Sequence, residues 1–427
     1  MGKLWHRLFL EERPSISLSF FRIAVAVTVG AHVIPSFFHL QDTFFHTAFK
    51  TVNTLFFPTG ILELVQKSSD GVVLGFVVLF CVFWFFFLIG LFSHLSCIVT
   101  TLCCYYFYAL NYFAVGCLSW DILLVTLFVM CLTPYPGDYF SLDCIGQCDT
   151  EAYKRRRPYF IQRFLQMQIA STFFYTALIK ITAKGNWFSD NPLYYLMNYP
   201  VEGVTKQFLL KDFLAVHPQL CYVIGVLIVC VELAMPFLLF YRPTRISAIY
   251  LGIIFHITLI LTLDVPAIFF FLFPPMLLLF INPNDIIAWI EQKRACNQPD
   301  HRVALLIYDG HCKFCRSTIV KLKIMDLFGT LKYVDYQTHP DLTRLHPKLT
   351  KEIAHSQIHL IEPDGRLYAG YFVFRRLCLK LPMLYPLIFL VYFPMSGAVG
   401  PLVYRWVANN RYLLHFNKIC DDNACFR

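Results

Sequence analysis

Two cysteines stand three positions apart, directly after a short apolar run. Residues 303–310 read VALLIYDG, which predicts a buried strand ending in a turn, and Cys312 and Cys315 follow at once. The amphipathic stretch that continues to about Leu327 predicts a helix beginning at these cysteines. The unpaired amides and dipole of a helix N-terminus favour thiolate over thiol. This placement therefore predicts a redox dithiol.

The order of the two cysteines suggests a role for each sulfur. Cys312 is predicted to be the attacking thiolate, with His311, Lys313 and Arg316 adding positive field around it. Cys315 lies about one helical turn further on, where it can close a disulfide and release the mixed intermediate. Such chemistry requires no cofactor, and its partner would be a disulfide-bearing protein or a small-molecule thiol.

Two other interpretations of the cysteine pair exist. As half of a zinc site, the pair would need two more ligands, and Cys420 and Cys425 are the pair on offer, far along the chain and spaced by four. Structural zinc sites have shorter spacings, so we predict no metal centre. The cysteines are alternatively small apolar packing residues, as those inside the long apolar runs are expected to be.

The elements after the cysteines complete a recognisable order. They are a strand at 331–336, a helix at 341–354, two strands at 358–361 and 366–370 around a Pro-Asp-Gly turn, and a helix from about 371. Strand, cysteine pair, helix, strand, helix, hairpin and helix is a thioredoxin-like order.

This part of the chain resembles a known family. The run from Tyr308 to Cys315, YDGHCKFC, is similar to the signature of the DCC family of thiol-disulfide oxidoreductases, and 404–412 resembles that family's closing helix. The resemblance covers about 303–416. It implies a thioredoxin-like α/β fold with Cys312 and Cys315 as the redox pair and Asp309 as the family's acid.

The sequence departs from thioredoxin itself just before the strand at 358–361. Residues 355–357 read His-Ser-Gln, so the proline that forms the peptide clamp of thioredoxin is absent. A general thioredoxin activity is therefore not expected.

The rest of the chain has the composition of a membrane protein. Of its 427 residues 57% are hydrophobic and only 15% are charged, against about 25% charged in soluble domains. Long apolar runs predict an α-helical polytopic membrane domain of about eight spans. These lie at 16–34, 72–92, 95–113, 118–134, 164–182, 219–240, 246–263 and 265–282. The apolar segment 383–403 holds three prolines, so we expect it to pack on its domain or lie on the membrane.

Charge placement sets the expected orientation and domain limits. With eight spans, four basic clusters fall on one side, before 16, between 134 and 164, between 240 and 246, and after 282, which predicts cytoplasmic termini. Of the net charge of +9, residues 303–427 carry the larger share. We therefore expect a membrane domain at 1–285, a linker at 286–302 and a basic domain at 303–427. A tethered basic domain suits lipid headgroups, and no nucleic-acid partner is predicted.

Ionisable residues within spans are costly and mark candidate sites. We interpret Arg22, near the inner end of its span, as snorkelling to the interface. Lys180 is expected near the outer end of its span. Glu232 and His256 sit deeper on successive spans, where they are expected to pair.

The same region carries a second resemblance. The run RFLQMQIASTFFYTALIK (163–180) with Trp187, Val-Glu-Leu at 231–233, and Phe-His at 255–256 resemble HTTM-type membrane proteins over about 15–285. That group includes the vitamin K-dependent gamma-carboxylase, in which a lysine at the position of Lys180 acts in the base chemistry. The resemblance implies a membrane site at Lys180, Glu232 and His256 that holds an isoprenoid quinone or lipid. The luminal C-terminal region of the carboxylase is absent here.

Three functions follow from these patterns. The first is a membrane protein with a cytoplasm-facing CxxC thiol-disulfide oxidoreductase domain. The second is a quinone- or lipid-binding, or carboxylase-like, membrane enzyme that uses the transmembrane site, with the CxxC as an accessory or vestige. The third is a lipid-binding or scaffolding protein without catalysis.

Overall fold

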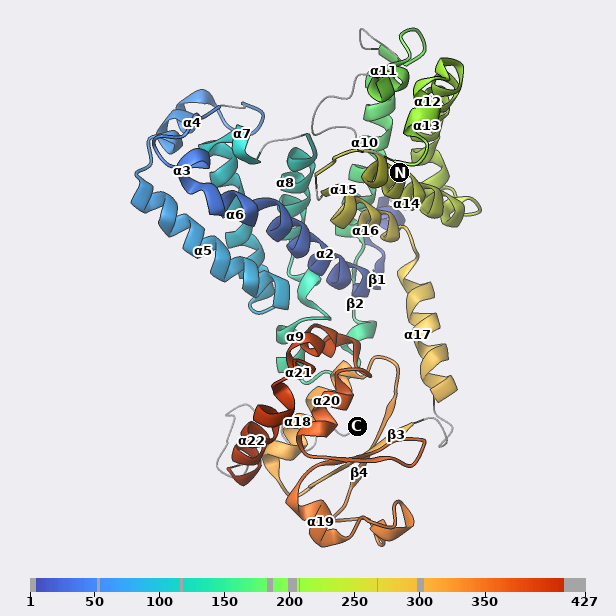
Figure 1. Cartoon of the computed structure of the whole chain (residues 1–427). Helices are drawn as coiled ribbons and strands as arrows, with labels where there is room; N and C mark the ends of the chain where they lie inside the picture. The colour runs from blue at the N-terminus through green and yellow to red at the C-terminus, as the bar shows by residue number, and fades with distance from the viewer. Residues whose placement is uncertain are drawn as a thin grey trace. The chain divides into compact units, whose positions relative to one another are not determined.

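The structure, a computed structural model, divides the chain into two compact units (Figure 1). One unit comprises residues 1–141 and 156–283, and the other comprises 142–155 and 284–427. Within these limits the residues that the structure describes are 5–51, 54–115, 118–182, 187–198, 206, 208–266, 268–297 and 303–410.

The first unit is helical. In lipid every backbone polar group needs an internal partner, and helices supply one within the segment. Its longer helices are α2 (Ile16–Val33), α5 (Asp70–Ile89), α6 (Ser93–Leu110), α8 (Leu118–Cys131), α10 (Phe160–Thr182), α13 (Pro218–Phe240) and α14 (Arg245–Thr262). Shorter elements connect them: α3 (Leu40–Thr43), α4 (Thr59–Gln66), α7 (Tyr112–Val115), α11 (Pro192–Asn198), α12 (Lys211–Ala215), α15 (Ile268–Phe271), α16 (Phe273–Leu278), and the antiparallel pair β1 (Glu12–Pro14) and β2 (Arg156–Pro158).

Among the residues that the structure describes, five helices are long and apolar enough to cross a membrane, and the number of spans rises to as many as seven if each of two bent helix pairs counts as one. The five coincide with predicted spans and run over Ile16–Thr43, Asp70–Ile89, Ser93–Leu110, Pro218–Phe240 and Arg245–Thr262. The other three predicted spans differ in a physical way. Helix α8 has 14 residues, α10 carries polar side chains along its length, and the last is divided into α15 and α16. The figure of eight stays a prediction.

Arg22 does not snorkel, and our interpretation of it was wrong. Its side chain is fully buried. The guanidinium donates to the carbonyl oxygen of Phe87, 3.0 Å away, and to that of Phe140. Gly90 follows at the end of α5 with φ +70°, and a Cβ there would lie 2.1 Å from Arg22 Nη1. Arg22 therefore ties α2 to the end of α5 and to the turn at Phe140.

The second unit contains a mixed four-stranded sheet in the order β4-β3-β5-β6. Its strands are β3 (Ala304–Tyr308), β4 (Leu331–Asp335), β5 (His359–Ile361) and β6 (Leu367–Ala369). β3 and β4 are parallel, with Tyr308 opposite Asp335, whereas β5 pairs antiparallel with both β3 and β6. Helix α18 (Lys313–Met325) provides the crossover between the parallel strands.

Alternate residues of the strands point to two separate cores. Leu306 and Leu360 pack with Val373 of α20 (Tyr371–Leu377) and with α18. Ile307 and Ile361 pack on the opposite face with residues around α19 (Lys351–Ser356). Figure 1 shows α19 on the other side of the sheet from α18 and α20. The predicted strands and the hairpin turn are confirmed, while the predicted helix at 341–354 is a 3₁₀ turn followed by the short α19.

Two segments beyond the predicted C-terminal domain belong to this unit. The predicted linker 286–302 begins inside helix α17 (Pro283–Asn297), and its residues 298–302 lie outside the described part of the chain. Arg294 of α17 donates to the carbonyl oxygen of Leu327 at 3.1 Å. Tyr153, from the 142–155 segment that includes α9 (Leu142–Gly146), donates to Glu291 of α17. The unit is therefore assembled from two separate parts of the chain.

The apolar segment 383–403 is not one straight helix. It runs through a 3₁₀ turn (Pro382–Leu387), α21 (Ile388–Val391) and α22 (Ser396–Asn409), with a bend of 115° between the two halves. The bend fits the three prolines, which interrupt helical hydrogen bonding.

Arg22→Met is expected to destabilise the protein strongly. The substitution leaves one buried and one partly buried carbonyl oxygen without their donor, a loss of about 2–4 kcal/mol in the free energy of unfolding. The thermal unfolding midpoint of the purified protein in detergent measures it. Arg242→Met is the control, because Arg242 is exposed. Equal unfolding midpoints for the two variants would contradict the bridging role of Arg22.

Candidate functional site

The two cysteines of the motif lie at the start of α18. Cys312 is the residue that caps the helix, and the backbone N–H of Cys315 donates to Cys312 Sγ at 3.3 Å. A sulfur that accepts an amide hydrogen at a helix N-terminus is stabilised as the thiolate. The predicted helix start is confirmed, and the local geometry is that required of a reactive dithiol.

The turn before the helix is held by two carboxylates. The backbone N–H of Gly310 donates to Asp335 Oδ1 at 3.0 Å, and a Cβ on Gly310 would lie 2.0 Å from Asp335 Oδ2. Glycine is therefore required here by a close approach of the carboxylate to the backbone. Asp309, which is 4% exposed, accepts from the backbone N–H of His311 at 3.0 Å and from Gln337 Nε2 at 3.3 Å.

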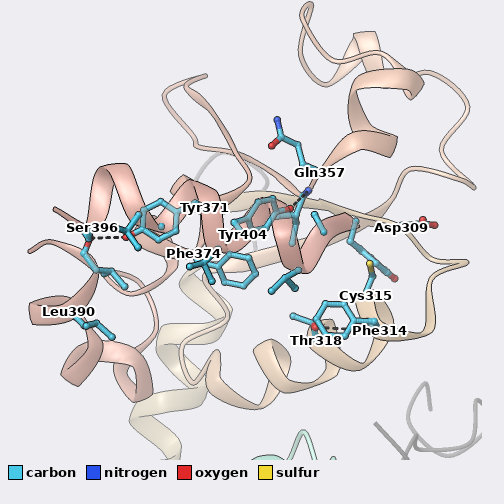
Figure 2. A pocket seen from close by; sticks show the side chains of 18 of the residues that line it. Asp309, Phe314, Cys315, Thr318, Gln357, Tyr371, Phe374, Leu390, Ser396 and Tyr404 are labelled. Atoms are coloured by element: carbon cyan, nitrogen blue, oxygen red, sulfur yellow. Dashed lines mark hydrogen bonds between the residues drawn. The ribbon is translucent and has the colours of Figure 1, made fainter. Parts of the chain in front are cut away.

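The two sulfurs differ in accessibility. Cys312 is fully buried, whereas Cys315 is partly exposed. Cys315 and Asp309 line a cavity of about 710 Å³ (Figure 2), and Cys312 is not among the residues that line it. The prediction that Cys312 attacks the substrate disulfide rests on its position at the start of the helix, and the structure has Cys312 at that position. The sulfur that faces open space, however, is that of Cys315.

Sequence reasoning missed Asp335 and the cavity. Asp335 ends β4 beside the end of β3, and the carboxyl ends of neighbouring parallel strands are where ligands and functional groups gather. That rule was the available signal for Asp335. Tyr308, at the end of β3, also lines the cavity, and burial raises the pKa of its hydroxyl above the ordinary value for tyrosine.

The second candidate site lies in the helical unit, where two of its three predicted residues meet. Lys180 Nζ on α10 contacts both carboxylate oxygens of Glu232 on α13, each at 2.7 Å. The side chain of Glu232 is 5% exposed and that of Lys180 is 22% exposed. Lys180 also lies over the ring of Trp187, 5.5 Å from its centroid. The predicted pairing of Glu232 with His256 is therefore wrong, because Lys180 provides the counter-charge.

His256 lies in an aromatic environment instead. It is 3% exposed, and neither ring nitrogen has a hydrogen-bond partner among the residues described. Its ring is 5.0 Å from that of Phe273 and 5.9 Å from that of Phe173, measured between centroids. A buried imidazole without a partner is costly, so His256 stays a candidate for binding a polar ligand group.

No metal centre is found in the part of the chain that the structure describes: no group of three or more His, Cys, Asp or Glu side chains is placed to hold an ion there. Cys420 and Cys425, the ligands of the alternative zinc interpretation, lie outside the described residues.

A helical unit with helices long and apolar enough to cross a membrane, joined to a mixed α/β unit with a capped cysteine pair, defines a class of membrane protein that carries a second, α/β domain. Comparison with protein families agrees. Residues 11–284 match the HTTM domain, so the chain belongs to the HTTM family. Residues 306–417 match the DCC1-like thiol-disulfide oxidoreductase family. Both resemblances noted in the sequence are thus confirmed, in one chain. No curated protein and no solved structure matches the chain.

Removing one partner of the Lys180–Glu232 pair is expected to lower the free energy of unfolding more than removing both partners. Lys180→Met or Glu232→Leu alone leaves a buried charge and should lower the free energy of unfolding by about 3 kcal/mol, while the double variant should be close to wild type. Thermal unfolding of the three variants in detergent measures this. Additive losses in the double variant would show that the pair is not coupled.

Proposed function

We propose that the protein is a membrane-anchored thiol-disulfide oxidoreductase that uses Cys312 and Cys315 as its redox pair. The observation that carries the proposal is the capping geometry, in which Cys312 Sγ accepts the Cys315 N–H at the start of α18 while Cys315 faces the cavity. The match to the DCC1-like family supports the same activity. Asp309, beside the pair on the cavity wall, is proposed as the acid that handles protons.

The domain is proposed to have a thioredoxin-like fold. A parallel βαβ unit, β3-α18-β4, followed by the antiparallel hairpin β5-β6 and helix α20, supports this, as does the strand order β4-β3-β5-β6. In this arrangement the crossover helix begins at the carboxyl end of β3, where Cys312 stands. The sheet thus fixes the position of the first sulfur.

The burial of Cys312 favours Cys315 as the sulfur that meets the substrate. The Cys315 thiolate attacks a substrate disulfide, forms a mixed disulfide and releases one substrate thiol. Cys312 then attacks Cys315 Sγ, forms the Cys312–Cys315 disulfide and releases the second thiol. The substrate disulfide is reduced by two electrons, and the enzyme dithiol is oxidised by two.

Cys312→Ser is expected to trap the mixed disulfide, because Cys315 reacts but lacks its resolving partner. Cys315→Ser should not trap it, because Cys312 is shielded. The probe is glutathione disulfide added to the reduced full-length protein, with the adduct detected by intact mass. Cys378→Ser, which removes a buried thiol elsewhere in the unit, serves as the control.

The outcomes separate two claims. Trapping by Cys315→Ser and not by Cys312→Ser would reverse the order of the sulfurs, as the helix position alone predicts. No adduct on either variant would overturn the oxidoreductase function.

We further propose eight spans, with both termini on the cytoplasmic side. Four basic clusters support this orientation; they lie before α2, between α8 and α10, at the α13–α14 turn and on α17. In the eight-span arrangement an even number of spans separates each cluster from the next, so all four lie on the same side of the membrane. The redox pair would then face the cytoplasm, where thiols are kept reduced.

An impermeant maleimide applied to intact cells tests the orientation. Cys296 on α17 is exposed and can therefore react with the reagent. Because the proposed orientation places α17 on the cytoplasmic side, Cys296 should react only after the membrane is opened. A cysteine placed by Asp212→Cys in the predicted outer loop 183–218 should react without opening, and it is the matched control. Labelling of Cys296 from outside would contradict the orientation.

A second candidate function uses the membrane site. The buried Lys180–Glu232 pair and the ring of His256, unpartnered among the described residues, favour a site for an isoprenoid quinone or lipid headgroup within the helical unit. In that function the dithiol is an accessory. The stable double variant Lys180→Met/Glu232→Leu separates the two functions, because it should retain dithiol chemistry and lose any activity of the membrane site.

A further inference from the structure

The cavity beside Cys315 is large and extends well beyond the cysteine pair. Its volume of about 710 Å³ is within the range of small-molecule sites. Its walls come from β3, α18, α20, α21 and α22. Figure 2 shows Cys315 at one end and Leu390 and Ser396 at the other. The cavity therefore connects the redox pair to the apolar segment at the end of the domain.

The polar groups of the wall are largely engaged with the protein itself. The hydroxyl of Thr318 donates to the Phe314 carbonyl oxygen at 2.9 Å. The hydroxyls of Tyr371 and Ser396 both donate to the Val391 carbonyl oxygen, at 3.1 and 2.6 Å. These groups have no hydrogen to offer a ligand. An occupant of this part of the cavity must therefore be held by apolar contact.

Ile358, on the cavity wall, offers no open backbone group to a polypeptide. An extended peptide substrate needs open backbone groups with which to pair. Directly after the 355–357 stretch, where thioredoxin carries its peptide clamp, the N–H of Ile358 donates to Tyr404 Oη at 3.1 Å. The carbonyl oxygen of Ile358 accepts from the N–H of Gly370 at 2.9 Å. Both backbone groups are used within the domain.

The far end of the cavity is walled by side chains that are both apolar and exposed. Leu390 is 70% exposed, Phe393 60% and Val403 57%. Apolar helices with this exposure are typical of segments that lie at a membrane interface. The chain is already held to a membrane by its HTTM domain. An apolar molecule dissolved in the bilayer therefore has an apolar surface by which to enter.

We propose that this cavity binds a membrane-dissolved quinone, with its hydrocarbon tail along α21 and α22 and its ring at Cys315. The proposal rests on the proposed dithiol function and adds a quinone, beside a substrate disulfide, as an electron acceptor of the dithiol. An occupant must be apolar, come from the membrane and exchange two electrons with a dithiol. A quinone meets all three conditions, because it is apolar, dissolves in the bilayer and accepts two electrons and two protons at its ring.

The electrons and protons balance in two steps. The Cys315 thiolate adds to a ring carbon, so that an S–C bond forms and the electron pair moves to a ring oxygen, which takes a proton. The Cys312 thiolate then attacks Cys315 Sγ, forming the disulfide and breaking the S–C bond; the bonding pair moves to the second ring oxygen, which takes a proton, and the hydroquinone is released. The quinone gains two electrons from the dithiol, and the two protons that its oxygens gain balance the two that the cysteine thiols lose on ionising.

The test measures oxidation of the reduced full-length protein in detergent by decylubiquinone and, separately, by hydroxyethyl disulfide. Val403→Trp fills the cavity and should lower the ratio of the quinone rate to the disulfide rate about tenfold or more. Leu402→Trp is the matched control: Leu402 is the neighbouring residue, 59% exposed, and does not line the cavity. This variant should leave the ratio unchanged. Quinone absorbance gives the first rate, and thiol counting by alkylation confirms disulfide formation.

The outcomes distinguish this inference from the proposed function. A protein that reduces the disulfide but not the quinone overturns the inference and leaves the oxidoreductase function standing. Equal rate ratios for Val403→Trp and Leu402→Trp also overturn the inference alone. A protein that reacts with neither probe overturns the proposed function, and this inference falls with it.

Discussion

The parallel pairing of β3 with β4 is the constraint on which the candidate site depends. It brings the ends of two strands together, so that Asp335 reaches the backbone of Gly310 at 3.0 Å and holds the turn that precedes α18. This turn at Gly310 fixes the residue at which helix α18 begins. Because the helix begins at Cys312, its sulfur accepts the amide hydrogen of Cys315. The position of the Cys312 sulfur at the helix N-terminus thus depends on the pairing of β3 with β4.

In the helical unit, buried polar and charged side chains need partners within the protein. Arg22 is buried, yet its guanidinium reaches two carbonyl oxygens where helix α5 and the turn at Phe140 leave them available. Lys180 and Glu232 neutralise each other from neighbouring helices. Both ring nitrogens of His256 lack a hydrogen-bond partner among the residues described, as do the buried Trp120 Nε1 and Thr100 Oγ1. A buried polar group without a partner is more costly than a paired one.

The two units contain separate features that bear on the proposed binding of membrane-dissolved molecules. In the helical unit the Lys180–Glu232 pair provides charge within a membrane domain. In the redox unit the cavity provides an apolar wall that ends at Cys315. A dithiol that takes its oxidant from the bilayer would need the apolar cavity wall beside Cys315, and it would not need the Lys180–Glu232 pair. The chemistry of the cavity wall, rather than the motif itself, therefore narrows the choice of electron acceptor.

The sequence by itself determined the features that depend on local spacing and composition. The apolar runs, the Cys312–Cys315 pair at a helix start, the Pro-Asp-Gly hairpin and the two family resemblances all follow from residues close together in the chain. The division of the last predicted span into α15 and α16 was not predicted; it falls at Leu272, just before Pro274 and Pro275, which cannot donate helical hydrogen bonds.

Only the tertiary structure decided which distant groups meet. Lys180 rather than His256 is the partner of Glu232, Arg22 is buried rather than snorkelling, and Cys315 rather than Cys312 faces the cavity. Each depends on how helices and strands pack, which spacing along one element does not specify. The cavity has the same origin, since its walls come from segments between Tyr308 and Ala408 that only packing brings together.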